Sequence, residues 1–206
     1  MPTAIPLDRI TGAQVVMDVE HHEIHNGNAY TCHYEVTGTG ATKMTAIAFI
    51  TGAEIPAVAL GQGLIHMTVD AGADDEAVLR IVEGPSMDLD EGTDLDVFNR
   101  DRGSADFANI TTVDAAPTVY HASYYGDVAA AGANITITAA NTLHYETIGQ
   151  SGNPVSSFGG RSRGEREFIL LPETQYIVIL TRSTANATFC EITLNFYQTV
   201  DNKYRS

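Results

Sequence analysis

Near the N-terminus, two histidines and a glutamate are spaced so that they could bind a metal ion together. Residues 20–25 read Glu-His-His-Glu-Ile-His. If this segment is a β-strand, His21, Glu23 and His25 share one face, because residues two apart point the same way. Two imidazoles and a carboxylate suit zinc or iron. The spacing does not match the helical HExxH motif, and no later His/Glu pair completes a cupin-type site. We prefer a polar strand edge or a subunit contact, and expect no metal ligand here.

Oxygen ligands that suit Ca²⁺ are concentrated in residues 87–94, which read Met-Asp-Leu-Asp-Glu-Gly-Thr-Asp. Carboxylates in a glycine-containing loop are typical of calcium sites. The EF-hand pattern is not met, because the flanking residues do not read as helices and the terminal glutamate is missing. A solvated acidic loop explains the same residues. We therefore do not expect the segment from Asp88 to Asp94 to hold a metal ion.

Motifs for other chemistry are missing from the sequence. There is no GxSxG nucleophile elbow, and neither cysteine lies in a reactive-site signature. A phosphate-binding GxxxxGK[ST] loop and a dinucleotide fingerprint are also missing. A carboxylate pair for glycoside hydrolysis stays open, since two acids can meet from distant segments. We expect a protein that is not an enzyme, with no catalytic residue and no cofactor.

The elements that position these residues are β-strands, because the hydrophobic pattern repeats every two residues. Residues 188–197 show it best, with apolar side chains at every second position (Cys190, Ile192, Leu194 and Phe196). Residues 176–180 are apolar on both faces, which predicts a central strand covered on both sides. A short helix is expected at 55–60. Further strands are expected at 14–19, 30–36, 43–51, 64–69, 77–83, 118–124, 134–138, 142–148 and 168–171.

Many short strands separated by glycine-rich turns favour a sandwich or barrel. The 206 residues suit one domain with a sizeable core. We predict an all-β fold, an antiparallel β-sandwich that is jelly-roll-like and forms a single domain. Its expected bounds are residues 14–200, with an N-terminal arm at 1–13 and a C-terminal tail at 201–206.

The composition excludes several partners and compartments. A formal net charge of −15 makes nucleic acid and anionic membranes unlikely partners. No apolar run approaches the length of a membrane helix, and the N-terminus does not read as a secretory signal. Cys32 and Cys190 both lie in strand-like runs, so we expect two buried thiols, with a single disulfide as the alternative.

Charge of opposite sign gathers in two parts of the chain. Residues 70–106 are expected to form a loop rich in acids, and residues 159–166 form a basic one. Complementary patches suit assembly with neighbouring copies or partners, because each patch can meet the other. Two solvated loops are the alternative interpretation.

Three groups of short motifs occur in order along most of the chain. The first is HHEIHNG at 21–27, followed by Tyr30. The second is VEGP at 82–85, GTDL at 92–95 and NRDR at 99–102. The third is GGR at 159–161, EFILLP at 167–172, TQY at 174–176 and LNFY at 194–197. Together they resemble a family of tailed-bacteriophage virion proteins that decorate, or cement, the head. Asp101 departs from the family pattern, in which a less acidic residue is expected between the two arginines.

This resemblance implies a β-sandwich that is not an enzyme and that stabilises the shell from the capsid exterior. The expected partners are the major capsid protein and the chain itself, as a homotrimer assembled in the host bacterial cytoplasm. The alternatives are a head-fibre base, a tail or baseplate adaptor, or a carbohydrate-binding module. Contacts with the capsid or between subunits are expected at Asn99, Arg100, Arg102, Arg161, Arg163 and Arg166.

Overall fold

Strands form almost all of the regular structure in the computed structural model of this protein. The structure describes residues 23–37, 43–53, 65–85, 92–113, 121–129, 142–148, 156–158, 167–182 and 189–198. The strands are β1 Ala29–Thr37, β2 Lys43–Thr51, β3 Ile65–Ala73, β4 Ala77–Glu83, β5 Thr93–Asp96, β6 Phe98–Asn99, β7 Ile110–Thr111, β8 His121–Ala129, β9 Thr142–Ile148, β10 Ser156–Phe158, β11 Glu167–Leu170, β12 Gln175–Arg182 and β13 Phe189–Gln198.

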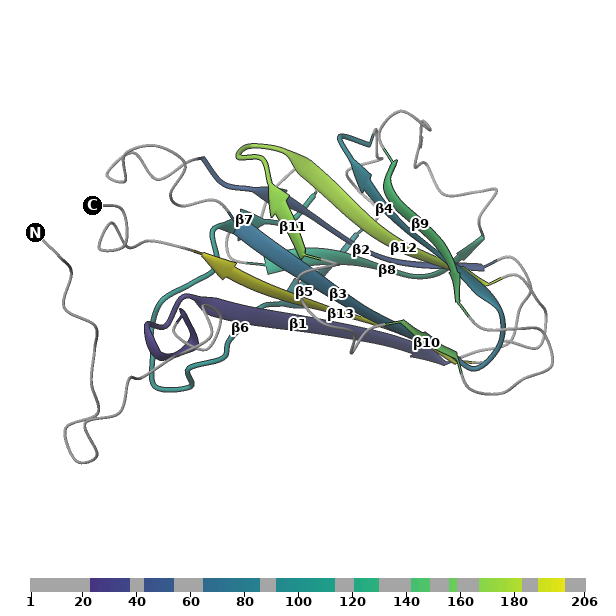
Figure 1. The fold of residues 1–206 in the computed structure, drawn as a ribbon, viewed down its shortest axis with the longest axis horizontal. Helices are drawn as coiled ribbons and strands as arrows, with labels where there is room; N and C mark the ends of the chain where they lie inside the picture. Colours follow the sequence, from purple (N-terminus) through teal and green to yellow (C-terminus); the bar gives the residue numbers. More distant parts are fainter. Residues whose placement is uncertain are drawn as a thin grey trace, which may run out of the picture.

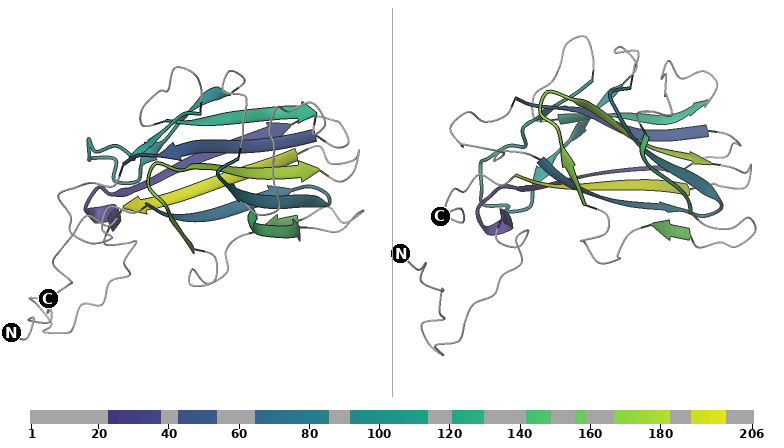
Figure 2. Two further views of the ribbon diagram at one scale, coloured as in Figure 1. Left: turned by 90° about the horizontal axis from the view of Figure 1, so that it is seen from above. Right: turned by 45° about the horizontal axis from the view of Figure 1, so that its top comes forward.

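The strands form two antiparallel sheets that pack as the two layers of a sandwich (Figures 1 and 2). The first sheet has the order β10-β3-β13-β1-β6, and β11 also pairs with β3. The second sheet has the order β5-β8-β2-β12-β4-β9, and β7 also pairs with β2. The predicted all-β sandwich is therefore confirmed.

The connections follow the double Greek key of a jelly roll. The chain crosses from one sheet to the other between β1 and β2, β2 and β3, and β3 and β4. It crosses again from β9 to β10, from β11 to β12, and from β12 to β13. The strands β5 to β8 are additional to this plan, since they lie between β4 and β9 and extend the sheet edges.

The core lies between the sheets and follows from the alternation in the sequence. Burial alternates along the whole of β13, as predicted for residues 188–197. Phe196 of β13 meets Phe49 of β2 edge to face, with ring centroids 5.1 Å apart. Tyr176 of β12 stacks on the same Phe49 ring at 5.8 Å. These large aromatic side chains join the two sheets at the centre of the sandwich.

Both faces of β12 are buried, which confirms the prediction of a central strand. Tyr176, Val178 and Leu180 point into the core between the sheets. Ile177 and Ile179 lie on the opposite face, in a second buried cluster with Ala46, Ala48, Val82 and Val113. A strand covered on both sides reads as a continuous apolar run rather than as an alternation.

Some expectations were wrong or fall outside the described residues. The acidic segment 70–106 is not one loop, because it contains the end of β3 and all of β4, β5 and β6. Residues 23–25 form a short helical turn rather than a strand. The strands expected at 14–19 and 134–138, the helix at 55–60, the arm and the tail lie outside the described residues. Both cysteines are buried thiols and form no disulfide.

Candidate functional site

The segment from Phe98 to Phe107, here called the aromatic loop, lies at one edge of the first sheet. It begins in β6, where Phe98 and Asn99 pair with Thr31 and Tyr30 of β1. Leu95 and Val97 pack against the core just before it. Because side chains alternate along an extended chain, this packing turns Phe98 outward.

The side chain of Asn99 closes the aromatic loop at its base. Its amide nitrogen donates to the backbone carbonyls of Gly27 at 2.7 Å and of Asp106 at 3.0 Å. Its amide oxygen accepts from the backbone N–H of Asp101 at 2.9 Å. One side chain therefore fixes both ends of the loop and anchors it to the turn before β1.

The interior of the aromatic loop is a chain of short-range hydrogen bonds. Asp101 accepts from the N–H of Gly103 at 2.9 Å, and its carbonyl accepts from the N–H of Ser104 at 3.1 Å. The Ser104 hydroxyl donates to the Asp106 carboxylate and accepts from the Asp106 N–H. Short polar side chains favour such turns. The acidic residue at position 101 therefore has a structural role in this chain.

Gly27 allows the aromatic loop to lie close to the helical turn. Its φ is +74°, a conformation that side chains other than glycine adopt with strain. A Cβ atom at this position would lie 2.4 Å from Ser104 Oγ. The loop therefore requires glycine at position 27 both for the backbone and for space.

Two phenylalanines and an arginine of the aromatic loop face solvent. Phe98 is 49% exposed and Phe107 is 61% exposed. The Arg102 guanidinium lies over the Phe98 ring, 5.4 Å from its centroid. Aromatic and arginine side chains dominate the binding energy of protein interfaces. An exposed set on a hydrogen-bonded loop is thus suited to dock on another protein.

The six contact residues expected from the sequence differ in what they do. Arg102 is exposed and belongs to the aromatic surface. Asn99 is a support for the loop, and the backbone N–H of Arg100 donates to the Ala29 carbonyl at 2.8 Å. Arg161, Arg163 and Arg166 lie outside the described residues. Phe98 and Phe107 were not predicted from the sequence. The apolar residues Leu95 and Val97 alternate with polar ones, and this pattern could have placed the Phe98 side chain on the solvent side of the strand.

Tyr30 lies beneath the aromatic loop and is almost fully buried. Burial raises the pKa of its hydroxyl to about 12, and the negative charge of Asp106 adds to this effect. A neutral, buried tyrosine below a fixed loop adds to the stiffness of this edge of the sandwich.

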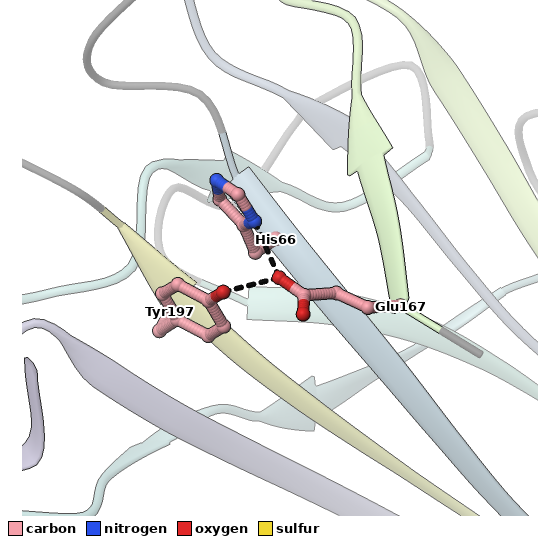
Figure 3. A network of polar contacts seen from close by, with 3 residues as sticks. All are labelled: His66, Glu167 and Tyr197. Atoms are coloured by element: carbon pink, nitrogen blue, oxygen red, sulfur yellow. Dashed lines mark hydrogen bonds and ion pairs between the residues drawn. The ribbon is translucent and has the colours of Figure 1, made fainter. Parts of the chain in front are cut away.

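A second polar cluster, formed by His66, Glu167 and Tyr197, lies on the outer face of the first sheet (Figure 3). His66 of β3 places Nδ1 2.5 Å from Glu167 Oε1 of β11. The Tyr197 hydroxyl of β13 donates to the same oxygen. The His66 and Tyr197 rings also stack, with centroids 4.5 Å apart. Glu167 thus reaches across β3 and joins three neighbouring strands.

The chemistry of this cluster is that of a charge-assisted hydrogen-bond network. With Glu167 ionised, we assign the Nδ1 proton to His66, so that this nitrogen donates to the carboxylate. Such a network supports one arrangement of β11 against β3 and β13.

The described residues contain no group of three or more His, Cys, Asp or Glu side chains placed to hold a metal ion. The prediction of a strand that aligns Glu23 with His25 is wrong, because residues 23–25 form a helical turn. The Glu23 carboxylate accepts a hydrogen bond from the Asn28 side-chain amide at 3.1 Å. His21 and Asp88 lie outside the described residues, whereas Asp94 is an exposed residue of β5.

Within the described part of the chain, no helix is long and apolar enough to cross a membrane. Comparisons with protein-family models, with curated proteins and with solved structures found no match to this chain.

Proposed function

We propose that this chain is a structural virion protein that binds the exterior of a bacteriophage capsid and cements the head shell. The proposal includes a homotrimer as its assembled form and the host bacterial cytoplasm as its place of assembly. Its sequence basis is the ordered set of motifs that resembles head decoration proteins. Its structural support is the aromatic loop, which presents Phe98, Phe107 and Arg102 to solvent.

A cement protein works by adding interface area between neighbouring capsomers. Packaged DNA pushes the capsomers apart, and a protein that bridges them resists this force. Stable interfaces of this kind bury about 1,600 Å² in total. A few aromatic or arginine side chains supply most of the binding energy. Phe98, Phe107 and Arg102 have the residue types that this role requires.

The stiffness of the aromatic loop favours tight binding. Ordering a flexible loop on association costs free energy that is then lost from the affinity. Here the hydrogen bonds of Asn99, Asp101 and Ser104 already order the loop in the single chain. The two phenylalanines are therefore presented with little further entropic cost.

Removing the aromatic side chains tests this proposal. The variants are Phe98→Ala and Phe107→Ala, with Ile169→Ala as the matched control. Ile169 is also 61% exposed but lies on β11, at the opposite edge of the same sheet. Binding is measured by co-sedimentation with capsids that lack this protein, taken from the phage that encodes it.

We expect each phenylalanine variant to bind capsids at least about 10-fold more weakly, and the Ile169 variant to bind as the parent does. Unchanged binding of both phenylalanine variants would show that the aromatic loop does not contact the shell. Failure of the parent protein itself to bind these capsids would overturn the proposed function.

A further inference from the structure

Among the described residues, the two edge strands of the second sheet differ in length and in charge. At one end, β5 is four residues long and exposes Asp94 and Asp96. Short, charged strands prevent edge-to-edge pairing. At the other end, β9 is seven residues long, and in the described part of the chain it pairs with β4 alone (Figure 1).

The composition of β9 does not discourage pairing. It contains neither lysine nor proline, and Glu146 is its one acidic residue. Its outer face exposes Leu143 by 43% and Tyr145 by 59%. The guanidinium of Arg80 lies 5.4 Å from the centre of the Tyr145 ring, which holds that ring on the sheet surface. β9, the last strand of this sheet in the described part of the chain, is of a kind that is prone to add another strand.

The order of charges along β9 selects both the partner and the register. When two copies of an antiparallel strand pair about a two-fold axis, directly opposed residues share a face. Pairing centred on Tyr145 places His144 of each copy opposite Glu146 of the other. A pairing centred on His144 would place the His144 side chains of the two copies opposite each other. A pairing centred on Glu146 would place two carboxylates opposite each other, and like charges repel. The irregularity in the pairing of β9 with β4 falls at the Leu143 end and leaves residues 144–146 regular.

We propose that β9 is a dimer contact, at which a second copy of this chain adds its own β9 in antiparallel pairing centred on Tyr145. The contact joins two seven-stranded sheets into one continuous sheet across the two-fold axis. Two His–Glu pairs and the facing Tyr145 rings set its register. This contact is proposed for the free chain in solution, whereas the homotrimer is the form proposed on the shell, and the contact does not depend on the proposed capsid function.

The pairing strand alone buries less than the roughly 1,200 Å² of a standard stable interface, so the dimer is weak in dilute solution. We expect a monomer–dimer equilibrium that sedimentation velocity resolves over about 10 to 500 µM protein. Measurement in about 0.15 M salt limits repulsion between the acidic chains.

Two charge variants and their mixture test the register. In a dimer of the His144→Glu variant, carboxylates at positions 144 and 146 face each other. In a dimer of the Glu146→His variant, imidazoles occupy the same two positions. We expect each variant alone to dimerise at least about 10-fold more weakly than the parent. In the mixture, every glutamate faces a histidine of the other variant, so a heterodimer of parent-like affinity is expected.

The mixture separates this contact from effects within one chain. His144 Nε2 and Glu146 Oε2 lie 3.3 Å apart in the same strand, and both variants lose that pair. Mixing cannot restore an intramolecular pair, so rescue reports the contact between copies. Asp94→His on β5 is the matched control, since it makes the same kind of change at the opposite sheet edge, and it should dimerise as the parent does.

Circular-dichroism melting curves establish that each variant is folded. A parent that remains monomeric over the whole concentration range overturns the proposal. Dimerisation that is unaffected in both variants, or a mixture that does not regain it, also overturns the contact at β9.

Discussion

Asn99 shows how one side chain can decide the shape of a candidate binding surface. Its amide group donates to carbonyls of two segments and accepts from a third backbone group. From the sequence, Asn99 is expected to contact a partner. In the structure, the hydrogen bonds of Asn99 hold the aromatic loop that carries Phe98 and Phe107, and its contact with a partner stays a prediction.

Replacing Asn99 by Asp tests this role at nearly constant size. The carboxylate keeps the acceptor for the Asp101 N–H but loses both donors, and it adds charge beside two other acids. We expect a loss of about 1–2 kcal/mol in the free energy of unfolding, measured by denaturant titration. Hydrogen exchange at Gly103 and Ser104 should become faster. Unchanged exchange at these amides would contradict the supporting role of Asn99.

Cys32 is protected chemically as well as sterically. It is fully buried in β1, and burial raises the pKa of its thiol to about 12. The thiolate is the reactive form, so little of it exists near neutral pH. We expect the native protein to react negligibly with Ellman's reagent at about pH 8. Both cysteines should react in guanidinium chloride. Rapid labelling of native Cys32 would show that β1 opens or is not part of the core.

At the scale of elements, long strands with a clear pattern were predictable, whereas most short strands were not, β11 being the exception. Strands β2, β4 and β9 have the bounds expected from the sequence. Strands β5, β6, β7 and β10 have between two and four residues, which is too short to show an alternation. Their position depends on the long strands that they pair with, and that information is not local in the sequence.

The candidate site was predictable only in part for the same reason. The NRDR motif at 99–102 lies within the aromatic loop, but it points to the polar residues of that loop and not to Phe98 or Phe107. The Asn99 side chain turns inward because its amide donates a hydrogen bond to the backbone carbonyl of Gly27. Gly27 lies 72 residues away in the sequence, so this contact is not visible in the local pattern. Likewise, the helical turn at 23–25 removes the alternation that made Glu23 and His25 look like metal ligands.

The cluster of His66, Glu167 and Tyr197 belongs to the scale of elements, because it joins β3, β11 and β13. Glu167→Gln keeps the size of the side chain and removes its charge. We expect the free energy of unfolding to fall by about 1–2 kcal/mol, measured by denaturant titration. The matched control is Glu191→Gln, on the same face of β13. Equal stability of the Glu167 variant and the parent would mean that the network does not hold β11 in place.

For the whole molecule, buried ionisable groups predict a loss of stability in alkali. The thiol of Cys32 and the hydroxyl of Tyr30 have ordinary pKa values of 9.0 and 10.0, and both are raised to about 12 in the folded chain. Below pH 9 both groups stay protonated in the folded and unfolded chain, so their full contribution is present. Between pH 9 and 12 the unfolded chain ionises first, and stability falls.

Denaturant titrations across this pH range measure the effect. The free energy of unfolding should decrease by at most about 1.4 kcal/mol per pH unit for each ionising group. The double variant Tyr30→Phe and Cys32→Ala should show a shallower decrease than the parent. An equally steep decrease in that variant would assign the alkaline transition to other groups.

The copy number of this chain in purified phage particles tests the central claim most directly. If the chain is a virion protein as proposed, quantitative mass spectrometry gives its ratio to the major capsid protein of the same particles. A shell cement is expected at a ratio near one, or near a simple fraction set by the symmetry of the shell. A few copies per particle would place the chain at a vertex or in the tail, and its absence from the particles would contradict a virion role altogether.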